Sequence, residues 1–147
     1  MNAGARAAGA VLGGLIAAAE SEADREVCGF VLGEGGGRPP ELVAMRNAAE
    51  DPARSFRMDP RDVLAVLRRA EREGRALAAM YHSHPSGGPS LSFRDLDELT
   101  VEGRPILPGV DLWVVGMEGG RAAEVRSFRW AGGAYLEVAR RRAPFTL

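Results

Sequence analysis

The sequence of 147 residues contains no lysine, only one cysteine and only two histidines. The absence of lysine excludes Schiff-base chemistry on a lysine side chain and a phosphate-binding P-loop, because both require that residue. The single cysteine, Cys28, excludes an internal disulfide and a cysteine-rich metal site. Such cysteine usage is typical of a reducing compartment, so we expect a cytoplasmic protein. We interpret Cys28 as a small buried apolar residue and not as a nucleophile.

The chain also lacks an excess of charge of either sign. Its 19 arginines are balanced by 20 acidic residues, which gives a net charge of -1. Because nucleic-acid-binding proteins carry a basic excess, we expect no nucleic-acid partner. The length predicts one domain, which we place at residues 1–140, followed by a C-terminal tail at 141–147. We interpret the arginine run at 140–142 as a solvated tail and not as a nucleic-acid-binding patch.

No apolar run is long enough to cross a bilayer, so we expect no membrane association. Residues 7–19 follow Arg6 and end in small residues, as a secretory signal peptide would. The apolar residues between Val11 and Ala19 nevertheless recur at helical spacing and form one stripe. This pattern favours an amphipathic helix over residues 5–23.

The remaining sequence alternates between strand and helix patterns. Asp59 and Pro60 form a typical helix start, with an N-cap residue followed by proline. Helices that flank a mostly antiparallel, mixed sheet indicate the α/β class. We expect further helices at 60–74 and 92–101, strands at 26–32, 41–46, 55–58, 76–83, 111–117, 121–130 and 135–141, and loops at 84–91 and 102–109.

The two histidines lie two residues apart in the segment YHSHP at 81–85. At the end of a strand, residues i and i+2 point to the same face, so both imidazoles can reach one point in space. Neutral imidazole is a good zinc ligand, and the spacing therefore suits a metal site. Two unrelated surface histidines would show the same spacing, and His82 and His84 alone leave that interpretation open.

Ser92 and Asp95 follow after a short loop. A serine N-cap with an acidic residue three positions later forms a capping box, which explains both residues structurally. The same helix start can return the Asp95 carboxylate to the strand end, beside His82 and His84. Three protein ligands with a fourth position for water are typical of catalytic zinc. Glu26, at the start of a buried strand, is then either a solvated carboxylate or the base for that water.

These residues together resemble a known motif. The patterns E-x-C-G-x-x-x-G at 26–33, H-S-H-P at 82–85 and S-x-x-D at 92–95 resemble the JAMM (MPN+) zinc metalloprotease motif, E-x(n)-H-S/T-H-P-x(n)-S-x-x-D. The similarity includes the segments 47–48 and 56–60. It extends over nearly the whole chain and is closest to the compact bacterial branch of the family.

The resemblance implies a single-domain, cytidine-deaminase-like MPN fold with a mixed, mostly antiparallel sheet. It implies that His82, His84 and Asp95 bind Zn²⁺. It further implies that Glu26 is the general base and that Ser92 donates a hydrogen bond to the oxyanion.

The function that the resemblance implies is that of a zinc metallopeptidase or isopeptidase. Segments 59–75 and 96–111 leave little room for the insertions that bind ubiquitin in eukaryotic members. Compact bacterial members act at the C-terminus of ubiquitin-like sulfur-carrier proteins, so we expect such a carrier as substrate. Its Gly-Gly tail would lie extended in a narrow channel between 85–91 and 102–109. A non-catalytic scaffold of the same fold and a zinc hydrolase of a small molecule stay open as alternatives.

Overall fold

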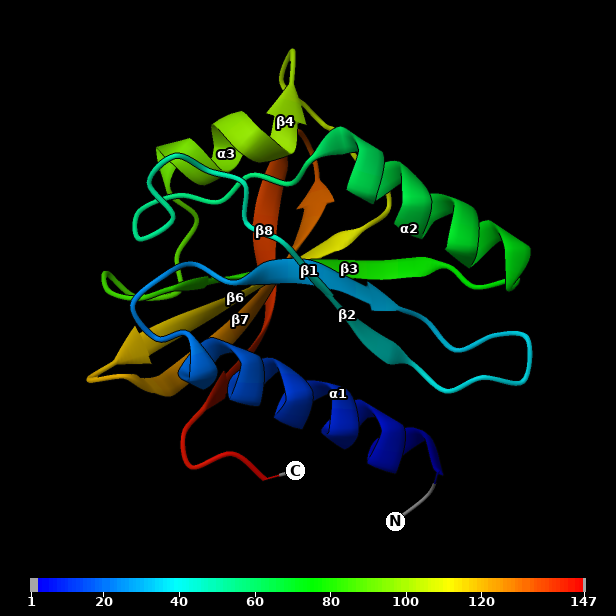
Figure 1. Cartoon of the computed structure of the whole chain (residues 1–147), viewed down its shortest axis with the longest axis horizontal. Coiled ribbons are helices and arrows are strands. Elements are labelled where there is room, and N and C mark those ends of the chain that lie inside the picture. Colours follow the sequence, from blue (N-terminus) through cyan, green and yellow to red (C-terminus); the bar gives the residue numbers. More distant parts are fainter. Residues whose placement is uncertain (1–2, 147) are drawn as a thin grey trace.

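The computed structural model describes residues 3–146, which form one layered α/β domain (Figure 1). The helices are α1 (Ala3–Ser21), α2 (Pro60–Arg72) and α3 (Phe93–Leu99). The strands are β1 (Cys28–Leu32), β2 (Glu41–Met45), β3 (Leu77–His84), β4 (Thr100–Val101), β5 (Arg104–Pro105), β6 (Asp111–Glu118), β7 (Arg121–Ala131) and β8 (Ala134–Arg142).

Six of the strands form the central sheet, in the order β2-β1-β3-β6-β7-β8. Only β3 and β6 pair in parallel, and the other neighbours in this sheet are antiparallel. This confirms the predicted mixed, mostly antiparallel sheet. The parallel pair places His82 opposite Val114 and His84 opposite Gly116. Both histidines therefore lie at the carboxyl end of β3, where α3 begins after a short loop.

Helices cover both faces of the sheet. Figure 1 shows α1 on one side and α2 with α3 on the other. The predicted N-terminal helix is confirmed, and its apolar stripe places Leu15 and Ala19 in a core with Tyr81 and Val115. A second core, centred on residues such as Phe30, lies under α2. Within the described residues, no helix has both the length and the hydrophobicity needed to cross a membrane.

The prediction of a strand at 55–58 is wrong. This segment has no strand partner and runs as an irregular chain before α2. Its backbone is held instead by the side chain of Asn47 and by main-chain hydrogen bonds from Ala48 to Arg57 and from Ser55 to Asp51. Phe56 points inward and is 4% exposed. The apolar residues of 55–58 are therefore buried although the segment does not pair with a strand.

Two segments near the end of the chain also differ from expectation. The predicted loop at 102–109 contains a short hairpin, in which Thr100 pairs with Pro105 across β4 and β5. Glu102 and Gly103 both have positive φ, as a two-residue hairpin turn requires. The arginine run at 140–142 lies in β8 and not in a tail. In β8, Arg140 and Arg142 form ion pairs with the carboxylate of Glu124.

Candidate metal centre

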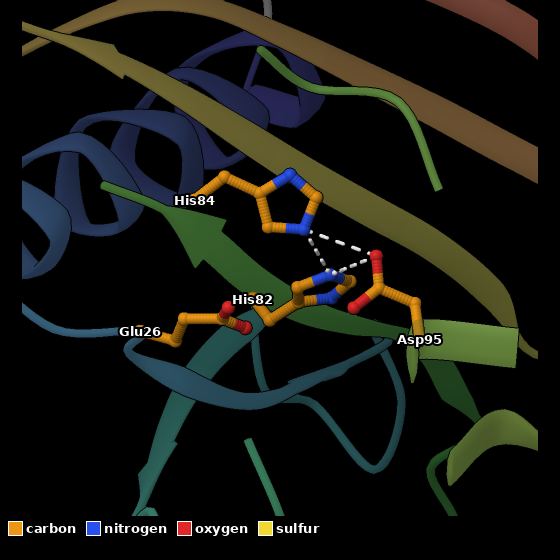
Figure 2. Close-up of side chains that lie close together, drawn as sticks. All are labelled: Glu26, His82, His84 and Asp95. Atoms are coloured by element: carbon orange, nitrogen blue, oxygen red, sulfur yellow. Dashed lines mark hydrogen bonds and ion pairs between the residues drawn. The ribbon is translucent and has the colours of Figure 1, made fainter. Parts of the chain in front are cut away.

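Four buried side chains converge at the carboxyl end of β3. Glu26 lies just before β1, His82 and His84 end β3, and Asp95 lies in the first turn of α3. One potential ligand atom from each residue lies within 4.8 Å of those of the other three. Figure 2 shows the four side chains directed towards a common region. The structure thus brings together Glu26 and the three residues that the sequence marked as metal ligands.

The distances within the cluster fit a metal ion. The Nε2 atoms of His82 and His84 are 3.1 Å apart. Oδ2 of Asp95 lies 3.2 Å from Nε2 of His82 and 3.0 Å from Nε2 of His84. Two nitrogen ligands of a tetrahedral zinc ion, each at 2.0–2.1 Å, lie about 3.3 Å from one another. Two imidazoles and one carboxylate at these separations therefore suit Zn²⁺.

The two imidazoles are held differently. His84 donates from Nδ1 to the carbonyl oxygen of Gly88 at 2.7 Å. Burial lowers the pKa of His84, but its hydrogen bonds to Asp95 and to this carbonyl outweigh burial and raise it. The ring of His82 stacks on Phe56, with centroids 4.4 Å apart. Burial is the main cause that lowers the pKa of His82, which favours the neutral ring that a metal requires.

The carboxyl group of Asp95 is held in its ionised form. Burial alone would raise the pKa of its carboxyl group, but hydrogen bonds to His82 and His84 hold it well below its usual range. The backbone N–H of Ser92 donates to Oδ2 of Asp95 at 2.9 Å, and the N–H of Asp95 donates to Oγ of Ser92 at 3.1 Å. The predicted capping box is thereby confirmed. It fixes the carboxylate at the strand end.

Glu26 is buried, at 4% exposure, and is not a solvated carboxylate. Its Oε1 atom is buried with no hydrogen-bond partner among the described residues. Burial is the main cause that raises the pKa of Glu26 to about 7, with Asp95 acting in the same direction and His84 opposing it. A carboxylate with this pKa can accept and return a proton near neutral pH.

The segment that carries Glu26 is attached to β3 by Ser83, which lies between the two histidines. The N–H of Val27 donates to Oγ of Ser83 at 2.9 Å, and the N–H of Ser83 donates to the carbonyl of Val27 at 3.0 Å. The neighbouring Cys28 is buried, and burial raises the pKa of its thiol to about 12. The thiol stays protonated at neutral pH, which agrees with the interpretation of Cys28 as an apolar residue.

Sequence reasoning missed the roles of Asn47 and Phe56. Both were noted only as parts of the resemblance, since neither is a metal ligand or a base. Phe56 contacts the ring of His82, and Asn47 contacts the backbone of Glu26. An asparagine directly after a strand is the one local feature that suggests a loop-stabilising role.

A hollow of about 1060 Å³ lies between α2 and the sheet, and none of the four cluster residues lines it. Its lining is mainly apolar, and Phe56 belongs both to this lining and to the contact with His82. Ile106 and Leu107 come from the segment 102–109 that was expected to border a substrate channel. The other expected wall, 85–91, does not line this hollow.

Comparison with known proteins agrees with the family resemblance of the sequence motif. Residues 9–131 match a family described as prokaryotic homologs of the JAB domain. The chain is similar to the CysO-cysteine peptidase of Mycobacterium tuberculosis, with 30% identity over 84% of this chain and 80% of that protein. It is also similar to the desampylase of Pyrococcus furiosus, with 35% identity over 52% of this chain. That match spans about half of the relative's length, 54%.

A solution structure of a protein from Desulfitobacterium hafniense shares the fold. The two superpose with a TM-score of 0.68 over 87% of this chain and 85% of the other, at 20% sequence identity. At that identity the similarity concerns the fold alone.

Proposed function

This chain belongs to the family of prokaryotic homologs of the JAB domain, and on that premise we propose that it is a zinc metallopeptidase. The bond cleaved is the C-terminal peptide or isopeptide bond of a ubiquitin-like sulfur-carrier protein. The observation that carries the proposal is the buried cluster of Glu26, His82, His84 and Asp95. A non-catalytic scaffold of this fold would be expected to have lost part of that set.

Three residues of the cluster would hold the zinc ion. His82 and His84 would contribute their imidazoles, and Asp95 its ionised carboxylate. Bound zinc supplies the Lewis acidity that activates a water molecule and polarises the scissile carbonyl. The Gly88 carbonyl keeps the proton of His84 on Nδ1, so that the lone pair of Nε2 faces the cluster.

Glu26 moves the proton. Its Oε1 has no competing hydrogen bond and can accept the proton of the attacking water. The pKa raised to about 7 allows the same group to donate that proton to the leaving amine. General acid–base catalysis of this kind contributes roughly 100- to 10,000-fold in rate.

Ser92 stabilises the carbonyl oxygen as it becomes negatively charged. Its Oγ accepts the hydrogen bond of the helix cap from Asp95, which leaves the hydroxyl proton free to be donated. Ser92 itself is exposed, so a substrate can reach it. A donor aimed at a developing oxyanion is a strong source of transition-state stabilisation.

The surroundings of the cluster favour a thin, extended tail as substrate. The four cluster residues are each less than a tenth exposed, so only a narrow chain can bring its carbonyl to them. Glycine has no side chain and suits that approach. The apolar hollow lined in part by Phe56 can take larger side chains further from the scissile bond. The similarity to a protein named CysO-cysteine peptidase supports a peptidase of this type.

The test is cleavage of a fusion in which a sulfur carrier from the same genome, ending in Gly-Gly, is followed by a short extension. Zinc-loaded protein should release the extension and leave a carrier that ends at Gly-Gly, as read by intact mass spectrometry. Protein treated with a chelator should be inactive until zinc is restored. Hydrolysis of small amides without cleavage of any carrier fusion would instead favour the small-molecule hydrolase.

A further inference from the structure

The loop between β2 and α2, residues 46–59, borders the metal centre without contributing a ligand. Its Phe56 stacks on His82 with ring planes inclined by 23°. The carbonyl of Pro52 in the same loop accepts the N–H of Glu26 at 2.7 Å. One loop therefore contacts both the base and a ligand residue.

The side-chain amide of Asn47 organises this loop. Its Nδ2 donates to the carbonyls of Glu26 and Ser55, each at 2.9 Å. Its Oδ1 accepts from the N–H groups of Ala49 and Arg57, at 3.0 and 3.1 Å. An amide offers two donor hydrogens and two acceptor lone pairs, and here all four are used.

The four hydrogen bonds of Asn47 hold the backbone beside Phe56 and at Glu26. Ser55 and Arg57 flank Phe56, so the amide fixes the backbone on both sides of the ring that packs on His82. Glu26 lies outside the β1 ladder, which begins at Cys28. Its backbone N–H and C=O are bonded to the loop, through Pro52 and Asn47.

We infer that Asn47 is a positioning residue, whose amide sets the placement of Glu26 and, through Phe56, of the His82 ring. The inference rests on the proposed metal centre. Groups that orient a metal ligand without touching the metal typically change metal affinity by about 10- to 100-fold when they are removed.

Two variants and a matched control test this role. Asn47→Asp keeps the size and the acceptor oxygen, but it places an oxygen against the carbonyls of Glu26 and Ser55. Asn47→Ala removes all four bonds. Glu41→Ala is the control, because it removes hydrogen bonds from Arg69 and Arg75 at the opposite end of β1, where Glu41 pairs with Leu32.

The readouts are zinc affinity by competition with a chromophoric chelator, the absorption spectrum of the cobalt-loaded protein, and thermal unfolding. Both Asn47 variants should bind zinc about 10- to 100-fold more weakly and show shifted cobalt bands. Glu41→Ala should unfold at a lower temperature with zinc affinity and spectrum unchanged. A positioning role is overturned if the Asn47 variants lose stability alone, as the control does.

Phe56→Leu provides a second route, which holds even if an Asn47 variant fails to fold. It keeps an apolar side chain but removes the aromatic face against His82, and it should also weaken zinc binding. Combined with Asn47→Asp, it should weaken zinc no further than the larger single effect. Strictly additive effects, or an unchanged affinity in Phe56→Leu, would contradict the path from Asn47 through Phe56 to His82.

These measurements need no substrate, which separates this inference from the proposed function. Weaker zinc binding in the Asn47 variants, together with no cleavage of any carrier, would refute the peptidase and retain the positioning role. If the carrier is cleaved, Asn47→Asp should lower kcat with little change in KM, because Asn47 does not face the hollow.

Discussion

The carbonyl oxygen of Gly88 lies 2.7 Å from Nδ1 of His84. A carbonyl oxygen only accepts hydrogen bonds, so Nδ1 carries a proton, and when the ring is neutral Nε2 is the nitrogen that presents a lone pair. That lone pair points to the region shared with His82 and Asp95 (Figure 2). The loop after β3 therefore selects the tautomer of the neutral His84 ring that suits a metal ligand.

Removing a ligand should remove the metal. His82→Ala and Asp95→Ala should each reduce the zinc content from one ion per chain to near zero, because two remaining ligands hold zinc poorly. Asp97→Ala is the matched control, since Asp97 is an exposed acidic residue in the same helix. Elemental analysis after dialysis measures the content. Unchanged zinc in His82→Ala would refute the ligand assignment.

Gly116→Ala should disturb the centre from the neighbouring strand. A Cβ at this position would lie 2.8 Å from Cδ and 2.9 Å from N of Pro89. The loop that holds His84 through Gly88 would have to move, so we expect weaker zinc binding in a chelator competition. Gly14→Ala is the control, because its Cβ would make only an ordinary contact at 3.5 Å. Equal zinc affinity in both variants would show that the loop adapts.

Glu26→Gln should retain the zinc ion but lose most of the catalytic turnover. The change preserves the shape of the side chain but removes the group that carries the proton. Turnover should fall roughly 100- to 10,000-fold while zinc content stays the same. The exposed Glu34 offers a control, since Glu34→Gln should be fully active. A near-normal rate in Glu26→Gln would leave Glu26 with a structural role only.

The pKa of Glu26 also predicts a pH dependence of stability in the metal-free protein. Burial is the main cause that raises this pKa from 4.5 to about 7. Between these values the folded chain binds a proton that the unfolded chain has released, so this group lowers the free energy of unfolding as pH rises. The full effect is about 3 kcal/mol.

Glu26→Gln removes that effect, because glutamine does not ionise. Chelator-treated Glu26→Gln should therefore be more stable than the parent protein at about pH 8, and the two should converge at about pH 4.5. Urea unfolding at both pH values measures the difference. A constant difference between the two proteins across this range would contradict a raised pKa.

The cluster of His82, His84 and Asp95 was predictable from the motif that the sequence resembles, and the local geometry agrees with it. The i, i+2 spacing of His82 and His84 needs only a strand, and Asp95 needs only a helix cap. The fold class followed from alternating patterns and turn residues, which are also local. Phe56 was predicted to lie in a strand at 55–58; it is buried, but a buried extended segment need not have a strand partner. The bonds of Asn47 join residues up to 21 positions apart, which no local pattern reports.

The proposal that this protein cleaves ubiquitin-like carrier tails is tested most directly by two fusions that differ at one residue. The first carries the Gly-Gly tail of a sulfur carrier before a short extension, and the second has Gly→Val next to the scissile bond. Intact mass spectrometry with zinc-loaded protein should show the extension released from the first fusion and the second left uncut, with zinc still bound. Failure to cleave the Gly-Gly fusion, or equal cleavage of both, would contradict a peptidase that admits only a glycine tail to the buried cluster of Glu26, His82, His84 and Asp95.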